Sequence, residues 1–389
     1  MSDKSTNLVD YLRWRGDLLL EQDPFNEVDN LLLCVVSYIN FGRVAKLRSK
    51  LPSDGVLLQD ICEQLTEEDE QRGLSTHGYI PIMKQMAASR RFADVRMFGF
   101  ESVHSEELEM QFDAVSFLLP DETVFIAFMG TDRSLVGWKE DFNMSFLATV
   151  PSQERAVVYA EAIAAACPDR KLRIGGHSKG GNLAAWAAAH LPTPLQDRLE
   201  SAYNNDGPGF SQALMETEGY HRVADRLHTL IPESSIIGVL LEHPDDYEII
   251  DSSNYAVMQH EPLSWNVVGN HFVQQEHRTL VGRMSDGVLR EWLASMSPGE
   301  RETFVEALFD LVTKGGKITS LEELPGGLAG GAALIREYAG AEEETKSAIL
   351  EGLRLLAGDV REGLKKSAEE GLSAAKRGLR ALLLEHGKN

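Results

Sequence analysis

The sequence predicts an α/β protein with a doubly wound, mostly parallel sheet, a helical N-terminal segment and a helical C-terminal tail. From about residue 96, strand-like apolar runs alternate with helix-like runs, and such alternation is typical of parallel sheets covered by helices. A glycine-rich turn, GGHSKGG, joins the strand-like KLRIG to the helix-like NLAAWAAAHL. The regions before and after the alternation have helical periodicity.

Residues 1–95 are predicted to be helical. A first helix covers DYLRWRGDLLL and is capped by Asn7 or Asp10, and FNEVDNLLLCVVSYINF has the apolar periodicity of a buried helix.

Residues 96–290 are predicted to form the α/β core. Its first three strands, in an antiparallel beginning, are RMFGFES, MQFDAVSFLLP and ETVFIAFMG. The elements expected after them are helix RAVVYAEAIAAAC, strand KLRIGG, helix NLAAWAAAHL, strand SAYNND, helix FSQALMET and strands RLHTLIP and YEIIDSS.

Residues 297–389 are predicted to be a helical C-terminal extension. Pro298 opens a helix, GERETFVEALFDLV, and the glycine-rich LPGGLAGGAAL resembles a hinge. From about Glu342 to Glu385, apolar residues recur along one helix face, although five glycines weaken that helix. Three roles stay open for this amphipathic tail: packing on the core, self-association and peripheral lipid contact.

Composition excludes several classes of protein. The 389 residues carry a net charge of −22, which argues against a nucleic-acid partner and against electrostatic docking on anionic lipid. Cys34, Cys62 and Cys167 have no metal-like spacing, so we expect reduced thiols, no metal and a cytoplasmic location. The N-terminus lacks the layout of a secretion signal. No apolar run reaches the ~18 residues of a transmembrane helix.

Ser178 is the candidate nucleophile. Gly176, Ser178 and Gly180 form Gly-x-Ser-x-Gly between a predicted strand and a predicted helix, which is the context of a nucleophile elbow. The helix that follows directs its N-terminal N–H groups toward the group that the serine attacks. His177 is expected to pack at the elbow rather than to act as the base.

A serine hydroxyl needs a base, and the base needs an acid that holds its tautomer. Asp206 follows the next predicted strand, in YNNDGPGF, and would therefore lie near Ser178 at the carboxyl edge of the sheet. Glu233, in IPESS, is the alternative acid. For the base we favour His260, in MQHEPLSW, with His271 as the alternative, because both lie on the long irregular segment after the last predicted strand.

The developing oxyanion also needs hydrogen-bond donors. The backbone N–H of Lys179 is one, because it follows the nucleophile. Thr131 is the other, since it follows the buried strand in FIAFMGTD, where Gly130 permits a close backbone approach. Trp138, Glu140 and Asp141 in GWKEDF are candidates for anchoring this loop.

The segments AFMGTDRSLVGWKEDF and GGHSKGGNLAAWAA resemble the class 3 lipase branch of the α/β-hydrolases. The stretch from about Leu8 to Gln275 is similar to a bacterial group of lipase-like proteins of unknown function. The resemblance implies an α/β-hydrolase fold, Ser178 as nucleophile, Thr131 and Lys179 as oxyanion donors and a downstream acid–histidine pair.

Two positions depart from this pattern. Lys179 stands where lipases usually carry leucine, and its cation would either favour an anionic or polar substrate or be solvated. The acid of class 3 lipases aligns with Ser235, whereas Asp206 resembles the acid position of other lipases.

These observations lead to two hypotheses. The first is a serine hydrolase that cleaves carboxylic esters, with a small-molecule or lipid acyl ester as substrate and no cofactor. The second is a catalytically silent protein of the same fold that binds or scaffolds through its amphipathic C-terminal helices.

Overall fold

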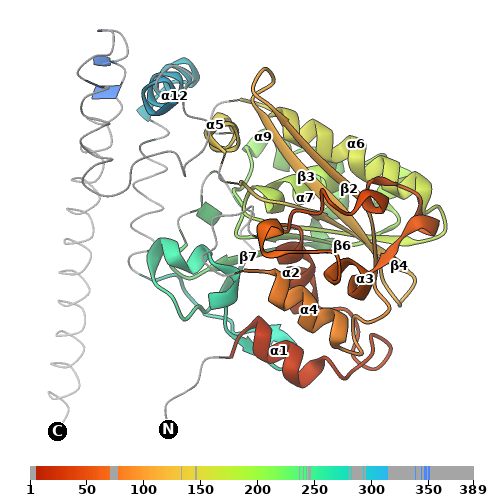
Figure 1. The fold of residues 1–389 in the computed structure, drawn as a ribbon. Helices are drawn as coiled ribbons and strands as arrows, with labels where there is room; N and C mark the ends of the chain where they lie inside the picture. The colour runs from red at the N-terminus through yellow and green to blue at the C-terminus, as the bar shows by residue number, and fades with distance from the viewer. Residues whose placement is uncertain are drawn as a thin grey trace, which may run out of the picture.

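Eight strands form one sheet whose spatial order is the order of the sequence, β1 to β8. Figure 1 shows the sheet with the helices around it. The computed structural model describes residues 6–313 without 71–77, 133, 145–146, 236, 240, 242, 244–246, 280–281, 283–291 and 293–294, and isolated positions from 338 to 350. The strands of the sheet are β1 (Val56–Leu57), β2 (Arg96–Ser105), β3 (Met110–Leu118), β4 (Thr123–Phe128), β5 (Lys171–His177), β6 (Leu199–Asn205), β7 (Leu227–Pro232) and β8 (Glu248–Ile250). A separate hairpin consists of β9 (Val267–Val268) and β10 (His271–Phe272).

Helices precede, connect and follow these strands. The α-helices are α1 (Leu8–Arg15), α2 (Glu27–Val36), α3 (Leu58–Cys62), α4 (Ile80–Ala88), α5 (Leu135–Asn143), α6 (Pro151–Ala166), α7 (Lys179–His190), α8 (Thr193–Gln196), α9 (Gln212–Met215), α10 (Glu218–Val223) and α12 (Pro298–Thr313). The 3₁₀ helices are η1 (Ala45–Arg48), η2 (Pro52–Asp54), η3 (Glu67–Asp69), η4 (Ala224–Arg226), η5 (Ile237–Val239), η6 (Ala256–His260) and η7 (Pro262–Ser264).

The direction of strand pairing changes at β4. The first four strands pair antiparallel, and β4 to β8 pair parallel. Helices that join consecutive parallel strands by right-handed crossovers must lie on one face of the sheet. Accordingly α6, α7 and α10 contribute to one apolar core, while the N-terminal helices α1, α2 and α4 cover the opposite face. Both faces are therefore buried, as parallel sheets require.

The fold predicted from the sequence, an α/β-hydrolase fold with a mostly parallel sheet and flanking helices, is confirmed. Each predicted core strand from RMFGFES to YEIIDSS is present, and Asn7 caps the first helix. Helix α5 was not expected from the sequence. Its N-cap is Ser134, whose side chain accepts a hydrogen bond from the Gly137 backbone. The predicted division of the chain into an N-terminal part (1–95), a core (96–290) and a C-terminal extension (297–389) stays a prediction.

Pro298 opens helix α12, as the sequence predicted. Helix α12 lies beside α5 (Figure 1). Phe304, Val305 and Phe309 of α12 pack with Leu135 of α5. The hinge LPGGLAGGAAL and most of the amphipathic tail lie outside the described residues. Within the described part of the chain, no helix is long and apolar enough to cross a membrane. The three cysteines are buried and free.

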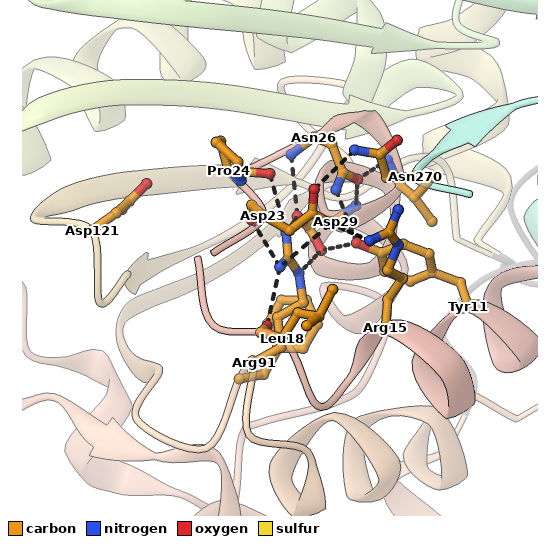
Figure 2. Close-up of polar contacts among 12 residues, drawn as sticks. Tyr11, Arg15, Leu18, Asp23, Pro24, Asn26, Asp29, Arg91, Asp121 and Asn270 are labelled. Atoms are coloured by element: carbon orange, nitrogen blue, oxygen red, sulfur yellow. Dashed lines mark hydrogen bonds and ion pairs between the residues drawn. The ribbon is translucent and has the colours of Figure 1, made fainter. Parts of the chain in front are cut away.

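A buried arginine joins the N-terminal helices (Figure 2). Arg91 and Asp29 are both fully buried, and both oxygens of Asp29 accept hydrogen bonds from the guanidinium group, with Nε 2.7 Å from Oδ1. The hydroxyl of Tyr11 and the backbone N–H of Asn26 donate to the same carboxylate, at 2.9 and 3.1 Å. The remaining guanidinium donors bind the carbonyls of Leu18, Asp23 and Pro24. A buried ion pair is tolerated only when its polar atoms are satisfied in this way.

Replacing Arg91 with methionine is expected to destabilise the fold by about 3–5 kcal/mol, because Asp29 would stay buried without its cation. The midpoint of urea unfolding, followed by tryptophan fluorescence, measures the loss. Arg13→Met is the matched control, since Arg13 pairs with Asp10 at the surface, where its side chain is 68% exposed. That variant should shift the midpoint far less. Equal shifts in the two variants would contradict the assigned role of Arg91.

Candidate active site

Ser178 lies in a strained turn between β5 and α7. Its φ of 59° and ψ of −135° fall in a region that costs a non-glycine residue about 1–3 kcal/mol. The turn ends β5 at His177 and begins α7 at Lys179, so the predicted strand, turn and helix are all present. Ser178 is partly exposed, whereas its neighbours on both sides are buried. The backbone thus presents the serine at the carboxyl end of β5.

The two glycines of the motif allow this turn to pack closely. A Cβ atom on Gly176 would lie 2.0 Å from the carbonyl oxygen of Gly180. A Cβ atom on Gly180 would lie 2.1 Å from the carbonyl oxygen of Phe128, at the end of β4. Any side chain at either position would therefore push the helix away from the sheet.

Asp206 lies beside Ser178 because of the register of the parallel strands. His177 of β5 is paired with Asn205 of β6, so the next residues, Ser178 and Asp206, are neighbours at the carboxyl edge of the sheet. Asp206 is fully buried and has a φ of 53°, in the left-handed region. Its Oδ2 atom is 2.7 Å from Nδ1 of His260, whose side chain is 19% exposed at the end of η6. The structure therefore brings Asp206 and His260 into direct contact.

The alternative acid and base lie in other contacts. The Glu233 side chain is hydrogen-bonded to Gln259, and burial raises the pKa of its carboxyl group. His271 is exposed in β10 of the small hairpin, and its proximity partly offsets the rise in the pKa of Glu27 that burial causes. Of the two acids and two histidines weighed from the sequence, the structure pairs Asp206 with His260.

The loop after β4 lies against Ser178. A Cβ atom on Gly130 would lie 2.9 Å from Cβ of Ser178, so only glycine allows this approach. The hydroxyl of the buried Thr131 donates a hydrogen bond to Asp141 of α5. Burial raises the pKa of Asp141 to about 6, although the charge of Lys179 opposes the shift. Asp141 therefore anchors the loop, as the sequence suggested.

The side chain of Lys179 points into the protein, contrary to both expectations drawn from the sequence. Its Nζ atom is 3.0 Å from Oε2 of Glu140 and donates to the Gln111 carbonyl and side-chain oxygens, at 2.9 and 2.7 Å. Burial lowers the pKa of Lys179, but the nearby carboxylates of Glu140 and Asp141 more than offset this and raise it above the ordinary value. The cation is neither solvated nor presented to a substrate. As the first residue of α7, Lys179 has a backbone N–H outside the helical ladder.

His177 is buried, as expected, and it connects two parts of the site. Its Nδ1 atom is 3.0 Å from the hydroxyl of Tyr38, and its Nε2 atom is 2.8 Å from the carbonyl oxygen of His260. The sequence analysis did not identify Tyr38 as a site residue, because SYINF indicates only the end of a buried helix. It also missed Gln111, which appears in the sequence as one polar residue within a strand.

Several solved lipase structures are weakly similar to the chain. The Rhizomucor miehei lipase–propeptide complex is 15% identical, covering 44% of this chain and 70% of its own, with a TM-score of 0.32. Lip2 lipase from Yarrowia lipolytica is 14% identical over 51% of this chain and 78% of its own, also with a TM-score of 0.32. TM-scores of this size are too low to define a shared fold, so the fold assignment depends on the strand order described above. No curated protein matches the chain.

A family comparison gives a longer match. The Mbeg1-like family model matches residues 86–310, more than half of the 389 residues. The match includes β2 to β10, the turn at Ser178 and the contact between Asp206 and His260. The predicted resemblance to a lipase-like group is confirmed by this match. The chain belongs to the Mbeg1-like family.

Proposed function

We propose that this protein is a serine hydrolase that cleaves carboxylic esters, with Ser178 as nucleophile, His260 as general base and Asp206 as the acid that orients it. The proposal depends mainly on one observation, the 2.7 Å contact between Asp206 and His260 at the same sheet edge as Ser178. Nδ1 of His260 faces the carboxylate, which leaves Nε2 to accept the serine proton. A small-molecule or lipid acyl ester is the proposed substrate, and the reaction needs no cofactor.

The reaction follows from these roles. Nε2 of His260 takes the hydroxyl proton as the Ser178 oxygen attacks the ester carbonyl carbon, whose π electrons move to the carbonyl oxygen. The backbone N–H groups of Thr131 and Lys179 stabilise that oxyanion. Its collapse expels the alcohol, which receives the proton from His260. Water then releases the acid by the same route.

Two features of the site support the proposed oxyanion donors. The Gly130–Thr131 loop is in van der Waals reach of Ser178 and is anchored through Asp141. The side chain of Lys179 is held away from the site by Glu140 and Gln111, so only its backbone faces the turn. Donors that are fixed before the reaction need no reorganisation during it.

A fluorophosphonate probe is expected to label the wild-type chain covalently, and labelling should disappear in Ser178→Ala. Hydrolysis of a soluble p-nitrophenyl ester should fall by at least about 10⁴-fold in the same variant, because the nucleophile is lost. In-gel fluorescence and initial rates are the two measurements. Ser211→Ala is the control, since Ser211 caps α9 and has no proposed role in the site.

The result that would exclude the hydrolase is a folded wild-type chain that neither reacts with the probe nor hydrolyses any ester tested. That outcome would favour the catalytically silent binding or scaffolding protein.

Asp206→Asn is expected to lower kcat by about 10³–10⁴-fold while the chain stays folded, because the amide favours the wrong histidine tautomer. Steady-state kinetics with the same ester measure the loss. Glu233→Gln is the matched control and should keep nearly full activity, since Glu233 contacts Gln259 instead. A large loss in Glu233→Gln with little change in Asp206→Asn would reverse the assignment of the acid.

Asp141 is expected to make stability depend on pH. Its folded-state pKa of about 6 exceeds the ~3.9 of an unfolded aspartate, mainly because of burial. A raised pKa contributes stability that is fully present below the unfolded value and is lost as the pH rises through the folded value. Asp141→Asn, which stays neutral, should therefore gain stability relative to wild type between about pH 4.5 and about pH 7.5.

Urea unfolding at the two pH values measures this difference. The exposed Asp225 supplies the control variant, Asp225→Asn, whose stability difference from wild type should not change with pH. If the stability difference between Asp141→Asn and wild type is also the same at both pH values, the raised pKa of Asp141 is wrong.

A further inference from the structure

His177 is enclosed by groups from two distant parts of the chain. His177 is 4% exposed and is the last residue of β5, immediately before Ser178. Tyr38, from just beyond the end of α2, contacts its Nδ1 atom, and the His260 carbonyl contacts its Nε2 atom. The imidazole of His260 lies over it, with ring centroids 4.5 Å apart, and Trp265 packs edge-on at 6.2 Å. These contacts use both ring nitrogens.

The partners determine which nitrogen of His177 carries the proton. A carbonyl oxygen can only accept, so Nε2 must be the protonated nitrogen that donates to His260. Burial and the neighbouring His260 lower the pKa of His177 well below its ordinary value, so the ring is neutral. Nδ1 of a neutral ring with Nε2 protonated is an acceptor. We therefore assign the single hydroxyl proton of Tyr38 to Nδ1, at 3.0 Å, rather than to the more distant carbonyl oxygen of His177, at 3.3 Å.

Tyr38 also reaches the loop of the proposed oxyanion donors. A Cβ atom on Gly130 would lie 2.2 Å from the Tyr38 hydroxyl oxygen. Burial raises the pKa of Tyr38, and a hydrogen bond from the Gly130 backbone acts in the opposite direction. The phenolic oxygen thus lies against the backbone of Gly130 and donates to His177. One continuous series of contacts joins the Gly130 loop to the backbone of His260.

We propose that Tyr38 and His177 are positioning residues, which hold the backbone of His260 and the Gly130–Thr131 loop in register around Ser178. This inference rests on the proposed hydrolase function. Asp206 fixes the His260 ring at Nδ1, and His177 fixes the carbonyl of the same residue, so the base is held at two points. A neutral His177 also does not repel the positive charge that His260 acquires during the reaction. A second cation, with its ring centroid 4.5 Å away, would disfavour that charge.

Kinetics of Tyr38→Phe test the positioning role. The variant removes one hydroxyl, and we expect kcat for a soluble p-nitrophenyl ester to fall about 10-fold with KM within about twofold, because a small displacement of a catalytic group is costly. Tyr159→Phe is the matched control. Its buried hydroxyl donates to the Gly99 carbonyl at 2.8 Å, so its loss removes a comparable hydrogen bond elsewhere and should leave kcat within about twofold.

A pair of His177 variants provides a second comparison. His177→Leu removes the donor to His260 and should lower kcat about 100-fold, whereas His177→Gln keeps an amide N–H and should recover part of that loss. If kcat of Tyr38→Phe and His177→Leu falls no further than that of Tyr159→Phe, the inference is wrong while the hydrolase stands. If the wild type neither hydrolyses esters nor reacts with the probe, the proposed function itself fails.

A spectroscopic measurement on the full chain is independent of turnover. In a ¹⁵N-histidine NMR spectrum, assigned with His177→Gln, the His177 ring should stay in the neutral Nε2–H form between about pH 5 and about pH 8. A ring in the Nδ1–H form, or one that becomes protonated in this range, would overturn the inference whatever the activity of the chain.

Discussion

The site depends on a buried ion pair between Lys179 and Glu140, which connects the helix that begins at Lys179 to the sheet. Lys179 donates to the carbonyl and side-chain oxygens of Gln111 in β3, and Glu140 accepts from the Gln111 backbone and from Ser152 of α6. Removing two charges from water is costly unless every polar atom finds a partner, and here one lysine and one glutamate share five hydrogen bonds. Four elements are thereby fixed relative to one another, and α5, which carries Asp141 and hence anchors Thr131, is one of them. The same ion pair thus holds both proposed oxyanion donors, Lys179 directly and Thr131 through α5.

The sequence was most informative where local pattern and topology lead to the same answer. Apolar runs separated by turn residues identified β2 to β7, and the glycines around Ser178 identified the elbow, because close backbone packing leaves only glycine at those positions. The position of Asp206 beside Ser178 could be predicted from sequence spacing alone. One helix and one strand after Ser178 bring the chain back to the same edge of the sheet, next to Ser178. The family pattern pointed instead to the position of Ser235. Strand register was therefore the better guide to which carboxylate contacts His260.

The sequence could not show contacts that depend on tertiary packing. Lys179 looks like any lysine at a helix N-terminus, and its inward direction is decided by Glu140, 39 residues earlier. Helix α5 was missed because SLVGWKEDF lacks a clear apolar period, and its apolar residues pack with α12 from the far end of the described chain. The sequence likewise could not show the contacts that connect Tyr38 through His177 to His260. Each of these residues has an ordinary local explanation, and only the fold brings them together.

The N-terminal part of the chain supports the proposed catalytic histidine. The family match begins at residue 86, yet residues before it hold the segment that carries His260. The backbone N–H of Val267 donates to the Thr6 carbonyl at 2.8 Å, and that of Phe272 donates to Glu27 at 2.6 Å. Asn30 of α2 likewise donates to Asn205, the residue before Asp206, at 2.9 Å. Because Arg91 and Asp29 fix α1 and α2 in place, the N-terminal helices form part of the scaffold of the site. The position of the proposed base therefore depends on contacts between the N-terminal residues and the segment after β8.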